Sequence, residues 1–429
     1  MSEQPLQIGI IGFGIVGSGT YQTLLDNQES IDRKVGRPLR VKRIADLDWS
    51  RPRPVTVPEK LRTTDAAAIL DDPEISIVVE CIGGVKPSLD FVLRALRSGK
   101  NVVTSNKELI ARHGADLFEA CAEPRVDLMF EGSVGGGIPI IRPLKSCLAG
   151  NRITRLMGIV NGTTNYLLTK MMQEGAEFSD ALAEAQRLGY AEPDPTNDIA
   201  GHDAVFKLAI LGSIAFETRI RVEDIYREGV TGLAAVDMEY ARQLGCTIKL
   251  LAIGSLANGA VSLRVHPTLL PTTHPLAAVG GPFNAIFVRG SSVGEVMFYG
   301  QGAGSLPTGS AMVGDIIDVA RNIVNGSTGR ISCTCFAQRP VQPIAELQTR
   351  FYLRTTVSDR PGVLAAIATV FGEEGVSLES VLQKSATGEK AEIVWVTHET
   401  KERQMRASLA RLKALPEVAA INACLHAEL

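Results

Sequence analysis

A glycine-rich motif near the N-terminus limits the folds available to this chain. An apolar run at residues 6–11 is followed by Gly12-x-Gly14-x-x-Gly17 and then by a helical pattern through Leu25. The first glycine of such a motif allows a tight turn, the second lets backbone amides approach a pyrophosphate, and the third permits close packing of helix on strand. The motif alone is a weak signal, but its strand and helix predict a dinucleotide-binding loop rather than a packing turn.

Alternating strand and helix patterns continue to about residue 150. The order predicts a Rossmann-type doubly wound parallel sheet, an α/β domain with helices on both faces. We therefore expect residues 1–150 to form a dinucleotide-binding domain. The strand candidates are Leu39–Ala45, Ile75–Ile82, Asn101–Thr104 and Val126–Glu131, and the helix candidates are Pro87–Ser98 and Leu109–Ala122.

The pattern changes after residue 150. Residues 151–306 mix helices and strands and predict a second α+β domain, and a helix at 307–325 is expected to pack back on the first domain. Residues 326–349 are rich in Gly, Ser, Thr and Pro and indicate a linker. The helices expected in 151–306 are Thr164–Met172, Phe178–Leu188 and Asp198–Ile214, and the strands are Arg152–Val160, Ser262–His266, Asn284–Gly290 and Glu295–Gly300.

Residues 350–429 form a compact pattern of their own. Strands at 351–357, 376–384, 391–399 and 418–426 alternate with helices at 363–375 and 401–415. This β-α-β-β-α-β order predicts a ferredoxin-like domain.

Composition excludes several classes of function. The net charge of −3 does not favour binding to nucleic acid or to an anionic membrane surface. The chain contains no apolar run long enough to span a membrane, and its first residues do not form a signal peptide, so we expect a cytoplasmic protein. Its seven scattered cysteines fit no zinc or disulfide spacing and are expected to be reduced thiols.

Asp46 closes the second strand, where a carboxylate can bind the ribose 2′-hydroxyl of NAD. Arg51 and Arg53 follow closely and would bind the 2′-phosphate of NADP if their loop folds back. A turn or cap residue is an equally good interpretation of Asp46. We therefore expect NAD or NADP, with a slight preference for NAD.

Two further stretches lie at strand ends. Ser105 and Lys107 follow a strand at the edge where doubly wound sheets bind ligands, so Lys107 is expected beside the nicotinamide rather than only starting a helix. The glycine-rich stretch EGSVGGGIPII (131–141) can turn its carbonyl oxygens inward to hold a hard cation, or it can serve as a hinge. Residue chemistry alone favours the hinge.

The segment from Gly189 to Lys207 contains Glu192, Asp194, Asp198 and Asp203. On a helix, Asp203 and Lys207 share one face because they are four residues apart. They form either an exposed ion pair or a buried catalytic pair, and the apolar residues around them favour the second. His202 is treated as a helix-start residue, and Asp194 as a turn residue.

At this point the chain resembles homoserine dehydrogenases over nearly its whole length. The matching stretches are GFGIVG (12–17), TSNK (104–107), EGSVGGGIPII (131–141), GIVNGTTNYLL (158–168), LGYAEPDPTNDIAGHDAVFK (188–207) and YGQGAGSLPTGSA (299–311). The resemblance implies NAD(P)-dependent interconversion of L-aspartate 4-semialdehyde and L-homoserine, and a role in substrate binding and dimerisation for residues 151–306.

The resemblance also assigns roles to single residues. Lys207 would donate and accept the proton of the substrate oxygen, and Lys107 would lie in the active site. Glu192, Asp198 and Asp203 would hold the substrate or orient Lys207. In place of the hinge, the carbonyl oxygens of a four-residue set would bind a sodium ion: Glu131, Val134, Gly136 and Ile138. The cofactor would contact Gly12, Phe13, Gly14, Ile15, Val16, Gly17, Asp46, Ser105, Lys107, Gly189, Gly302 and Gly304.

The C-terminal pattern, with DRPGVL at 359–364, resembles an ACT domain. That resemblance implies threonine as a feedback inhibitor, and a homodimer or homotetramer. Two alternatives stay open at this point: another Rossmann-fold amino-acid or semialdehyde dehydrogenase, and a non-catalytic protein that senses amino acids. No cysteine lies in a clear nucleophile context, which disfavours a phosphorylating semialdehyde dehydrogenase.

Overall fold

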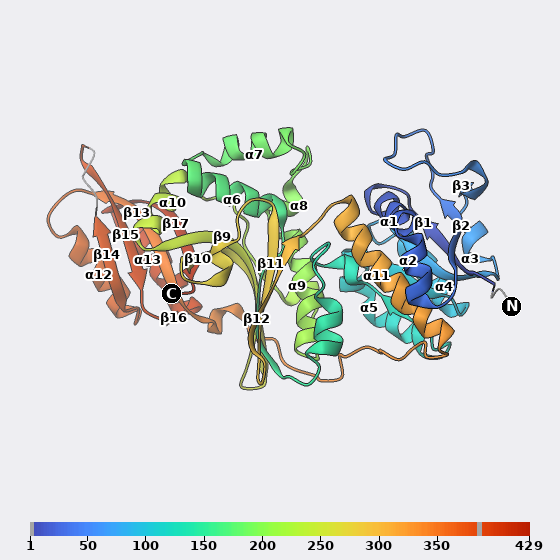
Figure 1. Ribbon diagram of the computed structural model, residues 1–429. Coiled ribbons are helices and arrows are strands. Elements are labelled where there is room, and N and C mark those ends of the chain that lie inside the picture. Colours follow the sequence, from blue (N-terminus) through green and yellow to red (C-terminus); the bar gives the residue numbers. More distant parts are fainter. Residues whose placement is uncertain (1–3, 384–387) are drawn as a thin grey trace. The chain divides into compact units, whose positions relative to one another are not determined.

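The computed structural model describes residues 4–383 and 388–429 (Figure 1). Lys384, which the sequence pattern assigns to a strand, and residues 1–3 of the expected first domain lie outside the described residues. The chain forms two compact units of three segments each. Unit 1 contains Met1–Ile153, Phe206–Val222 and Asn284–Gln338, and unit 2 contains Thr154–Val205, Glu223–Phe283 and Arg339–Leu429.

Unit 1 is built around a six-stranded sheet in which every neighbouring pair of strands is parallel. The strand order is β3-β2-β1-β4-β5-β6, so the direction of winding reverses between β1 and β4. Ligands of open α/β sheets bind beside the carboxyl ends of the strands at such a reversal. The strands are β1 (Leu6–Ile11), β2 (Leu39–Ala45), β3 (Arg62–Thr63), β4 (Ile75–Glu80), β5 (Asn101–Thr104) and β6 (Leu128–Met129).

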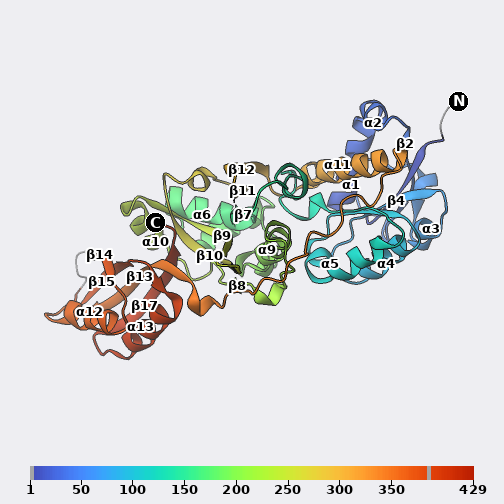
Figure 2. The same ribbon diagram turned by 90° about the horizontal axis from the view of Figure 1, so that it is seen from below.

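Helices cover both faces of this sheet, as the alternating pattern predicted (Figure 2). One face carries α1 (Ile15–Asp26), α2 (Gln28–Val35) and α11 (Ser305–Val324), and the other carries α3 (Ala67–Leu70), α4 (Ser88–Arg97) and α5 (Lys107–Ala122). Helix α11 packs closely on α1, because a Cβ atom on Gly309 would lie 2.5 Å from the carbonyl carbon of Gly19. Residues from both helices contribute to one hydrophobic core with β1 and β2.

The rest of unit 1 consists of shorter pieces. Strands β11 (Phe283–Gly290) and β12 (Gly294–Gln301) are neighbours in a sheet, and a π-helical turn covers Pro143–Cys147. Most of helix α9 (His202–Ala215) belongs to this unit, and residues 326–338 run beside the segment that follows it.

Unit 2 contains a long antiparallel pair, β9 (Cys246–Ala257) and β10 (Ala260–Pro271), with β7 (Ile153–Ile159) beside β9 and β8 (Tyr226–Arg227) beside β10. Its helices are α6 (Gly162–Glu174), α7 (Phe178–Arg187), α8 (Thr196–Ile199) and α10 (Ala235–Gln243).

The C-terminal part of unit 2 is the expected ferredoxin-like domain (Figures 1 and 2). Its sheet has the order β17-β13-β15-β14, and the helices α12 and α13 pack on its apolar core. Strand β17 also pairs in parallel with β10, through Thr268 with His426 and Leu269 with Ala427. The elements are β13 (Gln348–Ser358), α12 (Val363–Glu373), β14 (Leu378–Gln383), β15 (Lys390–Thr397), β16 (Thr400–Lys401), α13 (Glu402–Ala414) and β17 (Val418–Ala427).

Three local expectations were wrong. The helix expected from Asp198 to Ile214 is broken into α8 and α9, because Gly201 adopts a positive φ of 81° that ends the first helix. The strand expected to run to Glu131 stops at Met129, and Glu131 begins a 3-10 turn. The sequence pattern also did not predict α10 or β9. Among the described residues, no helix is long and apolar enough to cross a membrane.

Candidate active site

The glycine loop follows β1 and opens α1, as expected. Gly12 has a φ of +92°, and a Cβ atom there would lie 2.8 Å from the backbone carbon of Cys81. A Cβ atom on Gly17 would lie 2.1 Å from the carbonyl oxygen of Gly12, whereas one on Gly14 meets nothing within 4 Å. The protein itself therefore requires Gly12 and Gly17, whereas the space around Gly14 is open. Gly14 is the N-cap residue of α1, and the free N–H groups of a helix N-terminus favour an anionic group such as a pyrophosphate.

Asp46 lies beside this loop, and its carboxylate also accepts from the N–H of Asp48 at 3.0 Å, so the turn interpretation holds as well. Its carboxylate accepts a hydrogen bond from the N–H of Phe13 at 2.6 Å and is paired with Arg53 at 3.0 Å. The Arg53 guanidinium donates to the carbonyl oxygen of Phe13 at 3.0 Å and lies 4.9 Å from the Trp49 ring centre. The loop after β2 has thus folded back and placed a carboxylate and a guanidinium at the same end of the cofactor loop.

The strand end after β5 is held by side chains. Thr104 donates to Glu80 at 2.5 Å, and Asn106 caps helix α5 by accepting from the N–H of Leu109 at 3.0 Å. Lys107 is the first residue of α5 and is half-buried. A cation at a helix N-terminus is by itself unfavourable for the helix.

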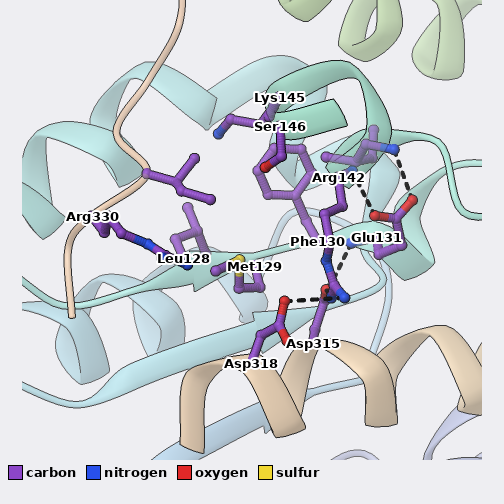
Figure 3. A pocket seen from close by; sticks show the side chains of 12 residues that line it. Leu128, Met129, Phe130, Glu131, Arg142, Lys145, Ser146, Asp315, Asp318 and Arg330 are labelled. Atoms are coloured by element: carbon purple, nitrogen blue, oxygen red, sulfur yellow. Dashed lines mark hydrogen bonds and ion pairs between the residues drawn. The ribbon is translucent and has the colours of Figure 1, made fainter. Parts of the chain in front are cut away.

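The glycine-rich turn at 131–142 is organised by the side chain of Glu131. Its carboxylate accepts from the N–H groups of Ile140, Ile141 and Arg142, at 2.5, 2.7 and 2.7 Å. The N–H of Glu131 donates to Asp315 of α11 at 2.8 Å, and Arg142 bridges to the same carboxylate (Figure 3). Burial and the nearby Glu131 carboxylate raise the pKa of Asp315 to about 7. These groups line a small cavity of about 120 Å³ together with Lys145 and Arg330.

The same turn contains buried residues whose carbonyl oxygens accept no backbone hydrogen bond from the described part of the chain. Gly135 and Gly136 have φ values of +75° and +56°, which turn the chain sharply. Among the described residues, no backbone N–H donates to the carbonyl oxygens of Val134, Gly136 or Ile138. These three carbonyl oxygens belong to the set that the resemblance assigns to a sodium ion. The described part of the chain contains no group of three or more His, Cys, Asp or Glu side chains that could hold a metal ion.

The turn that contains Gly302 and Gly304 reaches both the cofactor loop and the glycine-rich turn. A Cβ atom on Gly136 would lie 2.5 Å from the carbonyl carbon of Gly302. Gly304, with a φ of +123°, starts α11, and the next residue, Ser305, donates its hydroxyl to the carbonyl oxygen of Ile15 at 2.8 Å. Within unit 1, these predicted cofactor and cation residues therefore lie close together.

A second group of predicted residues gathers in unit 2. Asn161 donates from one amide nitrogen to Asp198 at 2.7 Å and to Asp203 at 2.8 Å. Thr163 adds a hydrogen bond to Asp198 at 3.0 Å. Asn161 also caps α6 by accepting from the N–H of Thr164 at 2.9 Å, so its position is fixed. Sequence reasoning did not single out Asn161 or Thr163, although both lie in the matched stretch at 158–168.

Other members of the segment are more exposed. Glu192 is exposed, and Gly189, also exposed, has a φ of +77°. Asp194 accepts from the N–H and hydroxyl of Thr196, at 3.1 and 2.6 Å, which is the turn role expected for it. Burial lowers the pKa of His202, the first residue of α9.

Lys207 lies within α9, one turn after Asp203. Both side chains are buried, with exposures of 8% and 6%. The exposed ion pair considered from the sequence is therefore excluded. A buried lysine requires compensation and is a candidate for chemistry.

Comparisons with known proteins agree with these features. Residues 12–131 match the model described as homoserine dehydrogenase, NAD binding domain, residues 139–317 match homoserine dehydrogenase, and residues 351–417 match the ACT domain. A homoserine dehydrogenase of Corynebacterium glutamicum is 46% identical over 98% of this chain and 95% of its own length. A homoserine dehydrogenase of Bacillus subtilis is 40% identical, and the match covers 99% of this chain and 98% of that protein.

Solved structures give the same result. The structure of a homoserine dehydrogenase from Thiobacillus denitrificans has 42% identity and a TM-score of 0.93, and the match covers 99% of this chain and 98% of that one. That of S. aureus homoserine dehydrogenase has 33% identity and a TM-score of 0.78, with 99% of both chains covered. This chain therefore belongs to the homoserine dehydrogenase family, NAD(P)-dependent oxidoreductases of amino-acid biosynthesis, and carries an ACT domain.

Proposed function

We propose that Lys207 donates and accepts the proton of the substrate oxygen when L-aspartate 4-semialdehyde and L-homoserine are interconverted. The observation that carries this proposal is a buried lysine placed one helical turn after a buried carboxylate, Asp203. Asp203 is in turn fixed by Asn161 at 2.8 Å. A buried ammonium group held in this way can act as a general acid, and its neutral form as a general base.

The nicotinamide cofactor supplies or accepts the hydride when it is bound. In the reductive direction, Lys207 as an ammonium ion gives a proton to the oxygen on which negative charge develops. Lys107 stabilises the same charge from the N-terminus of α5. Oxidation of homoserine needs neutral Lys207, so that direction is favoured by higher pH.

Three carboxylates complete the proposed site. Asp198 and Asp203, joined through Asn161, form an anionic surface that suits the ammonium group of the substrate and the orientation of Lys207. Glu192 is exposed and available to bind the same ammonium group. Gly189, Ser105 and the turn at Gly302 and Gly304 are assigned to the cofactor.

The variant Lys207→Met tests this proposal because it keeps the length and apolar stem of the side chain. We expect kcat to fall by about 10²-fold or more while NAD(P) binding is retained. Absorbance at 340 nm with homoserine measures the rate, and a nucleotide titration measures binding. Lys170→Met, which removes a lysine paired with Glu174 and Glu184 on the surface of unit 2, is the control. Near-normal turnover in Lys207→Met would exclude the assignment.

We also propose that the chain accepts both NAD and NADP. Asp46 suits the ribose 2′-hydroxyl of NAD, and Arg53, which lies against it, suits the 2′-phosphate of NADP. Arg53→Ala should raise KM for NADP and leave KM for NAD nearly unchanged. Arg51→Ala is the matched control, because the Arg51 side chain is exposed and is paired with Asp48. Equal effects on both cofactors would contradict this division.

A sodium ion at the turn 131–138 is part of the proposal. Support comes from the free carbonyl oxygens of Val134, Gly136 and Ile138, with Glu131 supplying the fourth. Oxygen ligands of this type suit a hard cation. Activity should rise when sodium is added to enzyme prepared in a large organic cation, and an unchanged rate would argue against the ion.

We propose threonine as an inhibitor that binds the ACT domain. A cavity of about 390 Å³ lies where β13 meets α12, and Ser358, Asp359 and Gly362 are in its wall. Its mixture of polar and apolar residues suits a small amino acid. Threonine should lower the initial rate of the intact chain, and a rate independent of threonine would exclude this role.

The remaining expectations belong to the same proposal. The proposed dinucleotide-binding domain is 1–150 with 307–325, the substrate-binding and dimerisation domain is 151–306, the linker is 326–349, and the ACT domain is 350–429. The matched ranges 12–131, 139–317 and 351–417 support this division. A homodimer or homotetramer is proposed from the resemblance alone. A cytoplasmic location is supported by the seven unpaired cysteines.

A further inference from the structure

Two cysteines separated by one residue lie in the segment 326–338 of unit 1. Cys333 and Cys335 are both half-buried. The segment is fixed beside the chain that follows α9, because the N–H of Ala337 donates to the carbonyl oxygen of Glu217 at 2.8 Å and Ala337 forms a β-bridge with Thr218. The two thiols are therefore held in a defined place that solvent still reaches.

The two cysteines contact each other. The N–H of Cys335 donates to the sulfur of Cys333 at 3.4 Å. The Cys335 thiol donates to the carbonyl oxygen of Ser213, near the end of α9, at 3.8 Å. The Cys333 sulfur thus accepts a backbone hydrogen bond from its neighbour, which is an arrangement suited to a thiolate.

Two cations favour a negative charge on the Cys333 sulfur. The neighbouring Cys335 side chain and N–H lower the pKa of the Cys333 thiol, and the cations Arg219 and Lys145 lower it further. Lys145 lies over the rings of Phe118 and Phe130, at 4.9 and 5.5 Å from their centres, so its charge is poorly screened by solvent. The pKa of Cys335 is raised, first by its interaction with the Cys333 sulfur and then by burial.

The other cysteines lack this combination. Burial raises the pKa of the Cys81, Cys121, Cys246 and Cys424 thiols, which makes them poor nucleophiles. Cys147 is exposed and serves as an internal standard for an ordinary accessible thiol.

We propose that Cys333 and Cys335 form a site of reversible oxidation by peroxides, with Cys333 as the attacking sulfur and Cys335 as the resolving one. The Cys333 thiolate attacks one oxygen of hydrogen peroxide, the O–O bond breaks, and the leaving hydroxide takes a proton to become water. The resulting sulfenic acid is attacked by the Cys335 sulfur, and a second water leaves as the disulfide forms. Two thiols lose two electrons and two protons, and the peroxide is reduced to two waters.

This inference is independent of the roles assigned to the catalytic lysines. Disulfide formation removes the Cys335 proton and with it the contact to Ser213. That contact lies at the last turn of the helix that carries Lys207. A small ring of this kind is strained and is therefore readily reduced again by cellular thiols.

Trypsin separates the relevant thiols. The peptide 331–350 contains Cys333 and Cys335 and no other cysteine, and the peptide 146–152 contains only Cys147. The intact enzyme is treated with one molar equivalent of hydrogen peroxide, and the remaining free thiols are then alkylated. After digestion, mass spectrometry measures the masses of the two peptides. We expect peptide 331–350 to lose two hydrogens and to escape alkylation while peptide 146–152 stays alkylated, and dithiothreitol should reverse the change. Equal or faster oxidation of Cys147 would overturn the proposal, as would a doubly alkylated 331–350 peptide.

Two serine variants test the order of attack. In Cys335→Ser the backbone N–H of residue 335 still donates to Cys333 but no resolving sulfur is present, so the sulfenic acid should accumulate there and be trapped by dimedone. In Cys333→Ser we expect no dimedone adduct on Cys335. Dimedone labelling of Cys335 in that variant, or none of Cys333 in the first, would overturn the assigned roles.

Discussion

Two buried polar centres organise the two units in opposite ways. In unit 1, the Glu131 carboxylate gathers three backbone N–H groups that follow it by nine to eleven residues. In unit 2, the Asn161 amide is shared between two carboxylates that follow it by 37 and 42 residues. The first centre shapes a local turn, and the second brings distant parts of the chain together.

The Glu131 centre controls the conformation of a turn, whereas the Asn161 centre controls the position of charged side chains. All three donors to the Glu131 carboxylate are backbone groups, so its side chain determines where the carbonyl oxygens of the turn point. Asn161 contacts Asp198 and Asp203, which are proposed to face the substrate, so it determines where negative charge lies. Changing Glu131 should therefore affect stability first, and changing Asn161 should affect activity first.

The largest effect is expected from Glu131→Ala. Three buried N–H groups would lose a charged acceptor, so the free energy of unfolding should fall by about 3–5 kcal/mol. Urea unfolding measures this change. Glu108→Ala removes an exposed carboxylate paired with Arg112 at 3.4 Å and should cost about 0.5 kcal/mol or less. A similar small loss in Glu131→Ala would contradict the organising role of Glu131.

Asn161 should show the reverse pattern. Asn161→Ala should lower kcat/KM for homoserine by about 10–100-fold, because Asp198 and Asp203 lose their shared donor. Asn161→Asp keeps an acceptor for the N–H of Thr164, and so retains the helix cap, but it supplies no amide donor. It should be no more active than Asn161→Ala, and repulsion of the new carboxylate by Asp198 and Asp203 should offset the stability that the cap supplies. Recovery of activity in Asn161→Asp would show that the cap, not the carboxylates, explains the residue.

The carboxylate next to Glu131 gives the first centre a pH dependence. The pKa of Asp315 is raised to about 7 in the folded chain, above its unfolded value, so the folded state binds more protons between the two values. Wild-type stability should therefore fall as pH rises through about 7. Relative to Asp315→Asn, the wild type should lose about 2 kcal/mol between about pH 5 and 8.

Unfolding free energies measured across that pH range check this prediction. Asp318→Asn is the matched control, because Asp318 pairs with the same Arg142 at 3.0 Å. The same pH dependence in both variants would show that Asp315 is not its source.

The smallest effect on the protein is expected in the glycine loop at residues 12–17, where backbone conformation rather than a side chain determines the structure. Gly14→Ala should leave the melting temperature unchanged, because a Cβ atom there meets nothing within 4 Å, and should weaken NAD(P) binding about tenfold. Gly12→Ala should instead lower the melting temperature, because its φ is +92° and its Cβ would lie 2.8 Å from Cys81. Melting curves and nucleotide titrations separate the two effects. Unchanged binding in Gly14→Ala would mean that the loop does not hold the cofactor.

The features that could be predicted from sequence are those that nearby residues determine. The glycine loop follows a strand and opens a helix at Ile15, as the spacing of Gly12, Gly14 and Gly17 requires. The alternating apolar runs predicted most of the parallel sheet, and the β-α-β-β-α-β order predicted the ferredoxin-like domain. In each case the spacing of apolar residues and the position of turn-forming residues predict the same elements that pack together in the structure.

The features that were missed depend on distant contacts. Nothing near Asn161 in the sequence shows that two aspartates about 40 residues later will share its amide. Glu131 was assigned only a backbone role, because the folded turn alone reveals that its side chain accepts from residues 140–142. Gly201 lies inside an otherwise helical pattern, and its left-handed conformation, which breaks the helix, is not marked by the residues around it.

The last two residues before the C-terminal leucine join the ACT domain to the rest of unit 2. The N–H of Glu428 donates to the carbonyl oxygen of Leu269 at 2.9 Å, and its carboxylate is paired with Arg155 and, at 2.8 Å, with the buried Arg264. Cutting the chain before β13 would expose the edge of β10 and leave a buried guanidinium without its counter-ion. Variants meant to remove the proposed control by threonine should therefore change residues in the ACT cavity and keep the domain, and an affinity tag should stay away from Glu428.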